Sequence, residues 1–212
     1  MTDRICALRS ACRAPRALPM LLAALAVGFG SSACGSSPTP RFYTINAIEA
    51  TEQASATASP LAVVVGPITI PRYLQRPQIV SRTGDSRLRY DEFNRWGGSL
   101  ESEVLRVLGE NLATLLATER VVVYPRRAVF PTDYAVRFDF ERFDAQRGEE
   151  LVLKVRWVVL PPAGGDALAV ESTTIREPLA SSKVKELVRA HGAALETLSR
   201  AVAGRLEKLA GS

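Results

Sequence analysis

The chain has 212 residues, of which 47% are hydrophobic and 23% charged, a composition typical of a globular protein with a sizeable core. Its 27 Lys and Arg residues outnumber its 22 Asp and Glu residues and give a formal net charge of +5. Four of those Arg residues and one Asp precede residue 34, so the rest of the chain carries only +2. The absence of a clustered basic region excludes the usual footprint of a nucleic-acid-binding protein.

Residues 1–33 have the three parts of a secretory signal peptide. Arg residues come first, an apolar run of 12 residues from Leu18 to Phe29 follows, and the small residues Ser31, Ser32 and Ala33 precede Cys34. A helix that spans a bilayer needs about 20 apolar residues, so this run suits a cleaved signal better than a permanent anchor. We expect cleavage before Cys34, followed by acylation of that cysteine, although Ser31 stands where such cleavage sites usually have Leu.

The other two cysteines, Cys6 and Cys12, lie inside the predicted signal peptide. A mature chain with one cysteine cannot form an internal disulfide, so its core must hold the fold. An uncleaved N-terminal membrane helix, or a free thiol at Cys34, is the alternative interpretation. After Cys34, residues 34–60 read as a polar tether that includes a short first strand over Arg41–Ile45 and a mobile loop over Ala47–Pro60.

The predicted domain covers residues 61–212 and begins with a β-branched run, Leu61–Ile70, typical of a strand buried on both faces. Two short strands are expected at Gln78–Ser81 and Arg87–Asp91. A helical period then starts after Ser99, a suitable N-cap residue, and places an apolar stripe on one face. The stripe consists of Leu100, Val104, Leu108, Leu112 and Leu115.

Further strands are predicted at Val121–Tyr124, from Tyr134 to beyond Glu141, from Leu151 to Val159, and at Leu168–Arg176. In the second and third of these strands, apolar residues alternate with charged ones. A turn at residues 145–148 would place Phe140 opposite Leu153 and Asp139 opposite Lys154. Apolar side chains would then face each other, and opposite charges would meet on the other face.

The last predicted element is a helix over residues 182–210. Its apolar residues recur at intervals of three and four: Val184, Val188, His191, Leu195, Leu198, Val202, Leu206 and Leu209. We expect this helix to pack across the sheet, because an apolar sheet face must be covered. A coiled coil or a partner-binding helix is the alternative.

The residues offer little for catalysis. His191 is the only histidine, and it lies on the apolar stripe of the last helix, where a packed, hydrogen-bonded histidine is commoner than a catalytic base. No cluster of His, Cys and carboxylate residues has the spacing of a metal site, and neither nucleotide-binding glycine pattern is present. We therefore expect no enzyme activity, no metal and no cofactor.

One stretch has the composition of a contact surface. It follows the β-branched strand and contains Tyr73, Leu74, Arg76, Pro77, Gln78 and Ile79, with Arg95 as a similar case near the first helix. Tyr and Arg are frequent at interfaces, and proline lowers the entropy lost on ordering. These residues are our predicted partner-binding residues. A rigid crossover that packs on its own domain is the alternative.

The sequence resembles the PqiC-like family, the auxiliary lipoproteins of ABC-type transport systems. The similarity lies in Tyr43, in residues 63–82 (VVVGPITIPRYLQRPQIVSR), and in residues 95–116 with the valine strand and Pro125 that follow. It implies an α/β (α+β) fold, a single domain in which a mixed β-sheet carries two main helices. It also implies a lipid-anchored protein that faces the periplasm and works with an MCE-domain protein of a lipid transporter.

The resemblance makes a non-enzymatic docking subunit of an MCE-type lipid transport system our first hypothesis. Gly35 stands where inner-membrane lipoproteins carry Asp, which favours delivery to the outer membrane. The expected partners are the MCE-domain protein, the membrane through the acyl chains on Cys34, and a neighbouring copy of the chain. A periplasmic carrier of lipid or another hydrophobic solute is the second hypothesis, and a hydrolase that uses His191 is the third.

Overall fold

A computed structural model describes residues 38–49, 61–84 and 86–211. The predicted signal peptide, Cys34 and most of the predicted 47–60 loop lie outside these residues. The elements, in chain order, are β1 (Arg41–Tyr43), β2 (Val63–Thr69), the 3-10 turn η2 (Arg72–Leu74), β3 (Gln78–Thr83), β4 (Arg87–Trp96), α2 (Leu100–Leu115), β5 (Val121–Val123), β6 (Tyr134–Gln146), β7 (Glu150–Leu160), β8 (Ala169–Pro178) and α3 (Val184–Ala210).

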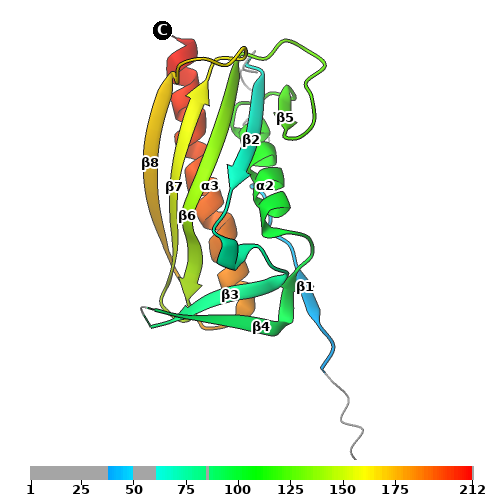
Figure 1. The fold of residues 1–212 in the computed structure, drawn as a ribbon, viewed down its shortest axis with the longest axis vertical. Coiled ribbons are helices and arrows are strands. Elements are labelled where there is room, and N and C mark those ends of the chain that lie inside the picture. The colour runs from blue at the N-terminus through cyan, green and yellow to red at the C-terminus, as the bar shows by residue number, and fades with distance from the viewer. Residues whose placement is uncertain (1–37, 50–60, 85, 212) are drawn as a thin grey trace, which may run out of the picture. The chain divides into compact units, whose positions relative to one another are not determined.

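All eight strands belong to one mixed sheet that branches at β6 (Figure 1). One edge of β6 pairs with β7, which pairs in turn with β8, and both pairings are antiparallel. The other edge is shared, because β2 runs parallel to the first half of β6 and β3 runs parallel to its last residues. One branch therefore continues from β2 to β5, and the other continues from β3 through β4 to β1.

Both helices pack on one face of this sheet. Helix α3 contacts β6, β7 and β8, whereas α2 contacts β2, β5 and α3. In β6, Val136, Phe138 and Phe140 are buried beneath the helices, and the intervening Arg137 and Asp139 are exposed on the other face. The predicted fold class, a mixed sheet with two main helices in a single domain, is confirmed.

The two predicted helices form close to their expected boundaries. Ser99 is the N-cap of α2, and its hydroxyl accepts a hydrogen bond of 3.1 Å from the backbone N–H of Ser102. In α3, the central stripe residues Leu195, Leu198 and Val202 are fully buried. The prediction that this helix packs across the sheet is confirmed, and the coiled-coil alternative is not needed to explain its stripe.

The predicted register of the long hairpin is wrong by two residues. Phe140 lies opposite Val155 instead of Leu153, and Asp139 lies opposite Arg156 instead of Lys154. The strand runs on to Gln146 before it turns, and the register shifts between Phe140 and Arg142, so that Glu141 has no partner in the pairing. Because the error is an even number of residues, every side chain before the bulge still points to the predicted face.

Strand β2 also differs from its prediction. Val63 and Val65 are fully buried, but Pro67 and Thr69 in the second half are exposed. This half faces the side of the sheet that no helix covers, where the Thr69 hydroxyl donates a hydrogen bond to Asp139. The next two strands run beyond their predicted ends, to Thr83 and Trp96.

Gly109 brings α2 close to the edge strand β5. A Cβ atom at Gly109 would lie 2.5 Å from Cγ2 of Val123, closer than two carbon atoms can approach. Gly in the interior of a helix costs about 1 kcal/mol relative to Ala. That cost is accepted here because the helix must lie against the valine side chains of β5.

We predict that Gly109→Ala lowers the free energy of unfolding by about 1 kcal/mol, because overpacking of roughly 1–3 kcal/mol outweighs the gain in helix propensity. Gly204→Ala in α3 is the matched control. No neighbouring atom lies within 4 Å of a Cβ at Gly204, so this change should stabilise the protein by about 0.5–1 kcal/mol. Urea unfolding of both variants tests the pair, and stabilisation by Gly109→Ala would contradict it.

Candidate functional site

His191 is a packed residue within the domain. Its side chain is 2% exposed, and its Nδ1 atom lies 2.7 Å from the carbonyl oxygen of Leu187, to which it donates a hydrogen bond. The ring makes edge contacts with Trp96 and Phe143, at centroid distances of 5.2 and 4.5 Å. Burial lowers the pKa of His191 to about 4, so the imidazole is neutral at physiological pH. This environment suits packing better than proton transfer.

The described residues contain no group of three or more His, Cys, Asp and Glu side chains that could hold a metal ion. Within the same residues, no helix is both long and apolar enough to cross a membrane.

The predicted partner-binding residues divide into a buried set and an exposed set. Leu74 and Ile79 are 3% and 0% exposed, so the prediction that they take part in a contact surface is wrong: both belong to the core. Tyr73 is half-buried and packs against that core. Arg76 and Pro77 are exposed. The predicted segment is thus a rigid crossover that also presents a surface.

A buried carboxylate fixes this crossover to the sheet. The side chain of Asp144 on β6 is fully buried and accepts three hydrogen bonds. The donors are the Tyr73 hydroxyl at 2.5 Å, Nε of Arg82 at 2.7 Å and Nε of Arg142 at 3.1 Å. Two cations and a hydroxyl therefore compensate one buried anion.

The same cluster shifts two pKa values. Burial, together with the hydrogen bond to Asp144, raises the pKa of Tyr73 to about 12, so its hydroxyl stays protonated and keeps donating. The hydrogen bond to Asp144 also raises the pKa of Arg82. The Tyr73 hydroxyl donates its hydrogen bond within the domain, to Asp144. Tyr73 therefore stabilises the crossover and does not offer its hydroxyl to a partner.

The exposed residues of the crossover are held from several sides. The Arg76 guanidinium lies over the ring of Tyr90, 4.2 Å from its centroid. The carbonyl oxygen of Pro77 accepts a hydrogen bond of 2.8 Å from the backbone N–H of Trp96. Gln78 pairs with Arg95 across the β3–β4 ladder. We name the residues Arg76, Pro77, Gln78 and Arg95 the strand-exit face.

The sequence analysis missed Phe42, which lies beside this face. Phe42 pairs with Arg95 in the parallel β1–β4 ladder and is 66% exposed. Its neighbour Tyr43 packs on the core and donates a hydrogen bond of 2.9 Å to Asn94. The alternation within Arg41–Tyr43 could have indicated that Phe42 points outward, had the direction of the core been known.

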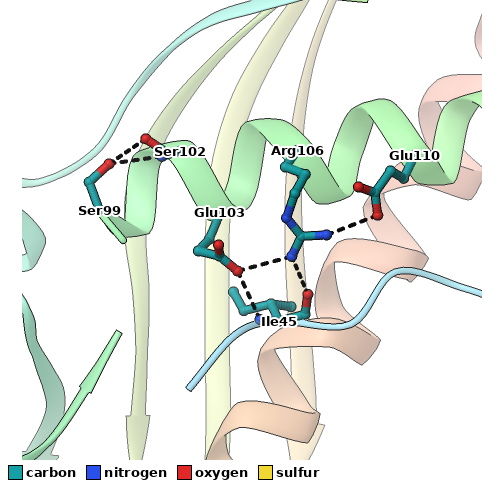
Figure 2. Close-up of polar contacts among 6 residues, drawn as sticks. All are labelled: Ile45, Ser99, Ser102, Glu103, Arg106 and Glu110. Atoms are coloured by element: carbon teal, nitrogen blue, oxygen red, sulfur yellow. Dashed lines mark hydrogen bonds and ion pairs between the residues drawn. The ribbon is translucent and has the colours of Figure 1, made fainter. Parts of the chain in front are cut away.

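Helix α2 holds the chain that follows β1, as Figure 2 shows. The backbone N–H of Ile45 donates to Oε2 of Glu103 at 3.0 Å, and Nη2 of Arg106 donates to the Ile45 carbonyl at 2.5 Å. Arg106 also forms ion pairs of 2.9 Å with Glu103 and Glu110. Both polar groups of a fully buried residue are thus satisfied by side chains, and β1 is fixed relative to α2.

An open groove runs between α2 and β5, with a volume of about 750 Å³. The apolar residues that line it include Leu105, Val121 and Val123, and the charged ones include Glu101, Arg106, Glu110 and Arg126. The space between α3 and the sheet, by contrast, is filled by side chains that are fully buried, such as Leu195 and Leu198. The carrier hypothesis expects a cavity between the sheet and the last helix. Among the described residues, that space is filled, and the open groove lies between α2 and β5 instead.

Comparison with known proteins supports the lipoprotein interpretation. A family model described as the ABC-type transport auxiliary lipoprotein component matches residues 43–203. Among curated proteins, no sequence matches the chain.

Solved structures share the fold at low sequence identity. A crystal structure of an uncharacterized protein is 15% identical, with a TM-score of 0.66, and the match covers 80% of this chain and 99% of that one. A Xanthomonas campestris protein, XCC0632 of the DUF330 family, is 16% identical, with a TM-score of 0.63 and coverage of 78% and 94%.

The depressed pKa of His191 predicts a pH dependence of stability. The unfolded chain binds a proton near pH 6.5, whereas the folded chain resists it until about pH 4, so His191 favours the folded state above pH 6.5. As the pH falls from 6.5 to 4, this contribution, up to about 3 kcal/mol, should be lost. His191→Leu cannot titrate and should lack this part of the acid destabilisation. Equal pH dependence of the unfolding free energy in both proteins would contradict the prediction.

Proposed function

The chain belongs to the family of ABC-type transport auxiliary lipoprotein components, and from this premise we propose that it is a non-enzymatic docking subunit of an MCE-type lipid transport system. In this proposal, acyl chains on Cys34 anchor the domain in the outer membrane, on its periplasmic face. The domain then binds the periplasmic MCE-domain protein, or a neighbouring copy of itself, through an exposed surface. The domain thereby holds the outer end of the transport path.

The anchor is supported by the sequence around Cys34. Residues 1–33 have the parts of a secretory signal, and Cys34 is the only cysteine that would remain after cleavage before it. Gly35 favours the outer membrane, since Asp is the residue linked with retention in the inner membrane. Two or three acyl chains hold a protein stably to a bilayer, whereas one chain gives only marginal binding.

The observation that carries the docking role is the rigid mounting of the strand-exit face. Arg76 and Pro77 are exposed, yet the crossover that bears them is locked to β6 through Tyr73 and Asp144. An interface residue that is already ordered loses less entropy on binding. Arginine and aromatic residues are also those most enriched at the energetic centre of interfaces. The described residues assemble no catalytic constellation that competes with this use.

The groove between α2 and β5 favours the second hypothesis, a carrier of lipid or another hydrophobic solute. Its volume of about 750 Å³ falls in the range of small-molecule sites, and its lining includes the apolar side chains of Leu105, Val121 and Val123 beside charged ones. The groove is open along its length, however, so an acyl chain in it would remain in contact with water. Native mass spectrometry of the purified protein would detect such a lipid, and an Ala113→Trp variant should displace it.

The first prediction of the docking model concerns the anchor. Mass spectrometry of the mature protein should find an acylated Cys34 as the first residue. Cys34→Ala should move the protein to the soluble fraction without a change in melting temperature, because residues 39–211 form the domain without it. An intact Met1 in the membrane fraction, or a chain that begins after Cys34, would contradict this prediction.

The second prediction concerns the strand-exit face. Arg76→Ala should weaken association with the transporter about thirtyfold, which corresponds to roughly 2 kcal/mol, and leave the melting temperature nearly unchanged. Co-purification and thermal unfolding measure the two effects. Arg156→Ala is the matched control, since Arg156 is an exposed arginine of β7 that forms an ion pair with Glu141.

A third variant separates support from contact. Tyr73→Phe removes the hydroxyl that donates a hydrogen bond to Asp144, and should lower the free energy of unfolding by about 1–3 kcal/mol. The folded fraction of this variant should associate with the transporter as well as the unchanged protein does. If Arg76→Ala binds the transporter as well as Arg156→Ala does, the docking surface lies elsewhere. The exposed side of α3 is then the next surface to test.

A further inference from the structure

Two exposed aromatic residues lie at the free edge of the β1–β4 branch. Phe42 on β1 is 66% exposed, and Phe93 on β4 is 43% exposed. The two strands are paired, with Phe42 opposite Arg95, so the rings belong to one edge of the sheet. Figure 1 shows β1 and the β3–β4 hairpin together at one end of the sheet. No described element covers this edge, because β1 is the last strand of its branch.

The chain length between Cys34 and this edge is short. Phe42 is the eighth residue after Cys34, and a fully extended chain spans at most about 3.3 Å per residue. The ring therefore attaches to the backbone no more than about 26 Å from the acylated residue. Of the strands described, β1 is the one closest in sequence to the acyl chains.

The charge of this edge suits a phospholipid surface. Near the two rings, β1 and β4 carry Arg41 and Arg95 against two acidic residues, Asp91 and Glu92. Asp91 is already neutralised by an ion pair of 2.7 Å with Arg147. Arginine beside exposed aromatic residues is the combination found where proteins lie at a membrane interface, because the rings enter the acyl boundary while the guanidinium groups contact phosphates.

We propose that Phe42 and Phe93, named here the β1–β4 edge, rest on the membrane that holds the acyl chains of Cys34. This inference rests on the proposed function, since it requires the anchor at Cys34. The occupant of the edge is the phospholipid bilayer itself, and the contact is shallow. The outer backbone groups of β1 have no strand partner among the described residues, and bare backbone polar groups are not tolerated within hydrocarbon. Only the aromatic rings enter the interface.

This contact would fix how the domain stands on the membrane. A tether alone leaves the domain free to rotate, whereas a second point of contact restricts it. The strand-exit face begins one strand away, because Arg95 lies between Phe42 and Gln78 in the ladder. The membrane contact would therefore hold Arg76 and Pro77 close to the bilayer at a constant height, where a periplasmic partner can meet them.

The test places a fluorescent reporter at the edge of the full, acylated protein. Phe42→Trp and, as a control, Val129→Trp are reconstituted into vesicles of phosphatidylethanolamine and phosphatidylglycerol that contain a lipid spin-labelled near its headgroup. Val129 is 97% exposed in the β5–β6 loop, so its substitution should be equally well tolerated. The native Trp96 and Trp157 are buried and contribute the same background to both variants.

We expect the emission at position 42 to be quenched at least twofold more strongly than that at position 129, with a shift to shorter wavelength. Equal quenching of the two variants in acylated, vesicle-bound protein would overturn the membrane contact and leave the docking proposal intact. A blue shift that disappears on dilution, without quenching, would show instead that the edge contacts a second copy. Protein that lacks the acyl mass and does not float with vesicles would refute the anchor, and the inference with it.

Discussion

The buried carboxylate of Asp144 is the interaction on which the rest of the structure depends. An isolated charge in a protein interior is strongly unfavourable, and breaking a buried ion pair costs about 3–5 kcal/mol. Here Arg82, Arg142 and the Tyr73 hydroxyl share the anion, so β3 and the β2–β3 crossover are bound to β6 by their charges as well as by their packing. Since β6 joins both branches of the sheet, this one group fixes the geometry on which the exposed Arg76 depends.

A bulge makes this arrangement possible. Before Glu141, the residues of β6 alternate strictly between the helix side and the open side, and the register shift at Glu141 resets that alternation. After it, Phe143 points to the helices and contacts His191, while Asp144 points to the other face, where the crossover covers it. Of these two consecutive residues, Phe143 packs in the core beneath α3, and Asp144 holds the crossover that bears the strand-exit face. The domain gains rigidity in this way through a buried carboxylate that pairs with two arginines.

The sequence predicted the periodic parts of the fold well. The stripes of α2 and α3 and the alternation in β6 and β7 reveal which face is buried, because each residue contributes to a repeating pattern. The predicted register of the hairpin was wrong because β6 runs on to Gln146 before it turns, and because a bulge at Glu141 adds one residue without changing the composition of the strand. Asp144 was missed for a related reason: its partners Tyr73 and Arg82 are more than 60 residues away, and no local pattern shows that a carboxylate is buried. Leu74 was assigned to the surface because its interface-like neighbours concealed its place in the core.

The two branches of the sheet differ in what covers them, and this difference explains where the candidate surfaces lie. Helix α2 packs on the β2–β5 branch and approaches β5 so closely that Gly109 is needed, whereas the β3–β4–β1 branch meets α3 through Trp96 and His191. The second branch therefore keeps a free edge and exposed residues on a backbone that is locked at two points, by Asp144 on β6 and by Glu103 and Arg106 at Ile45. The edge strand β1 and the strand-exit face are thus each held to the rest of the domain by hydrogen bonds from side chains.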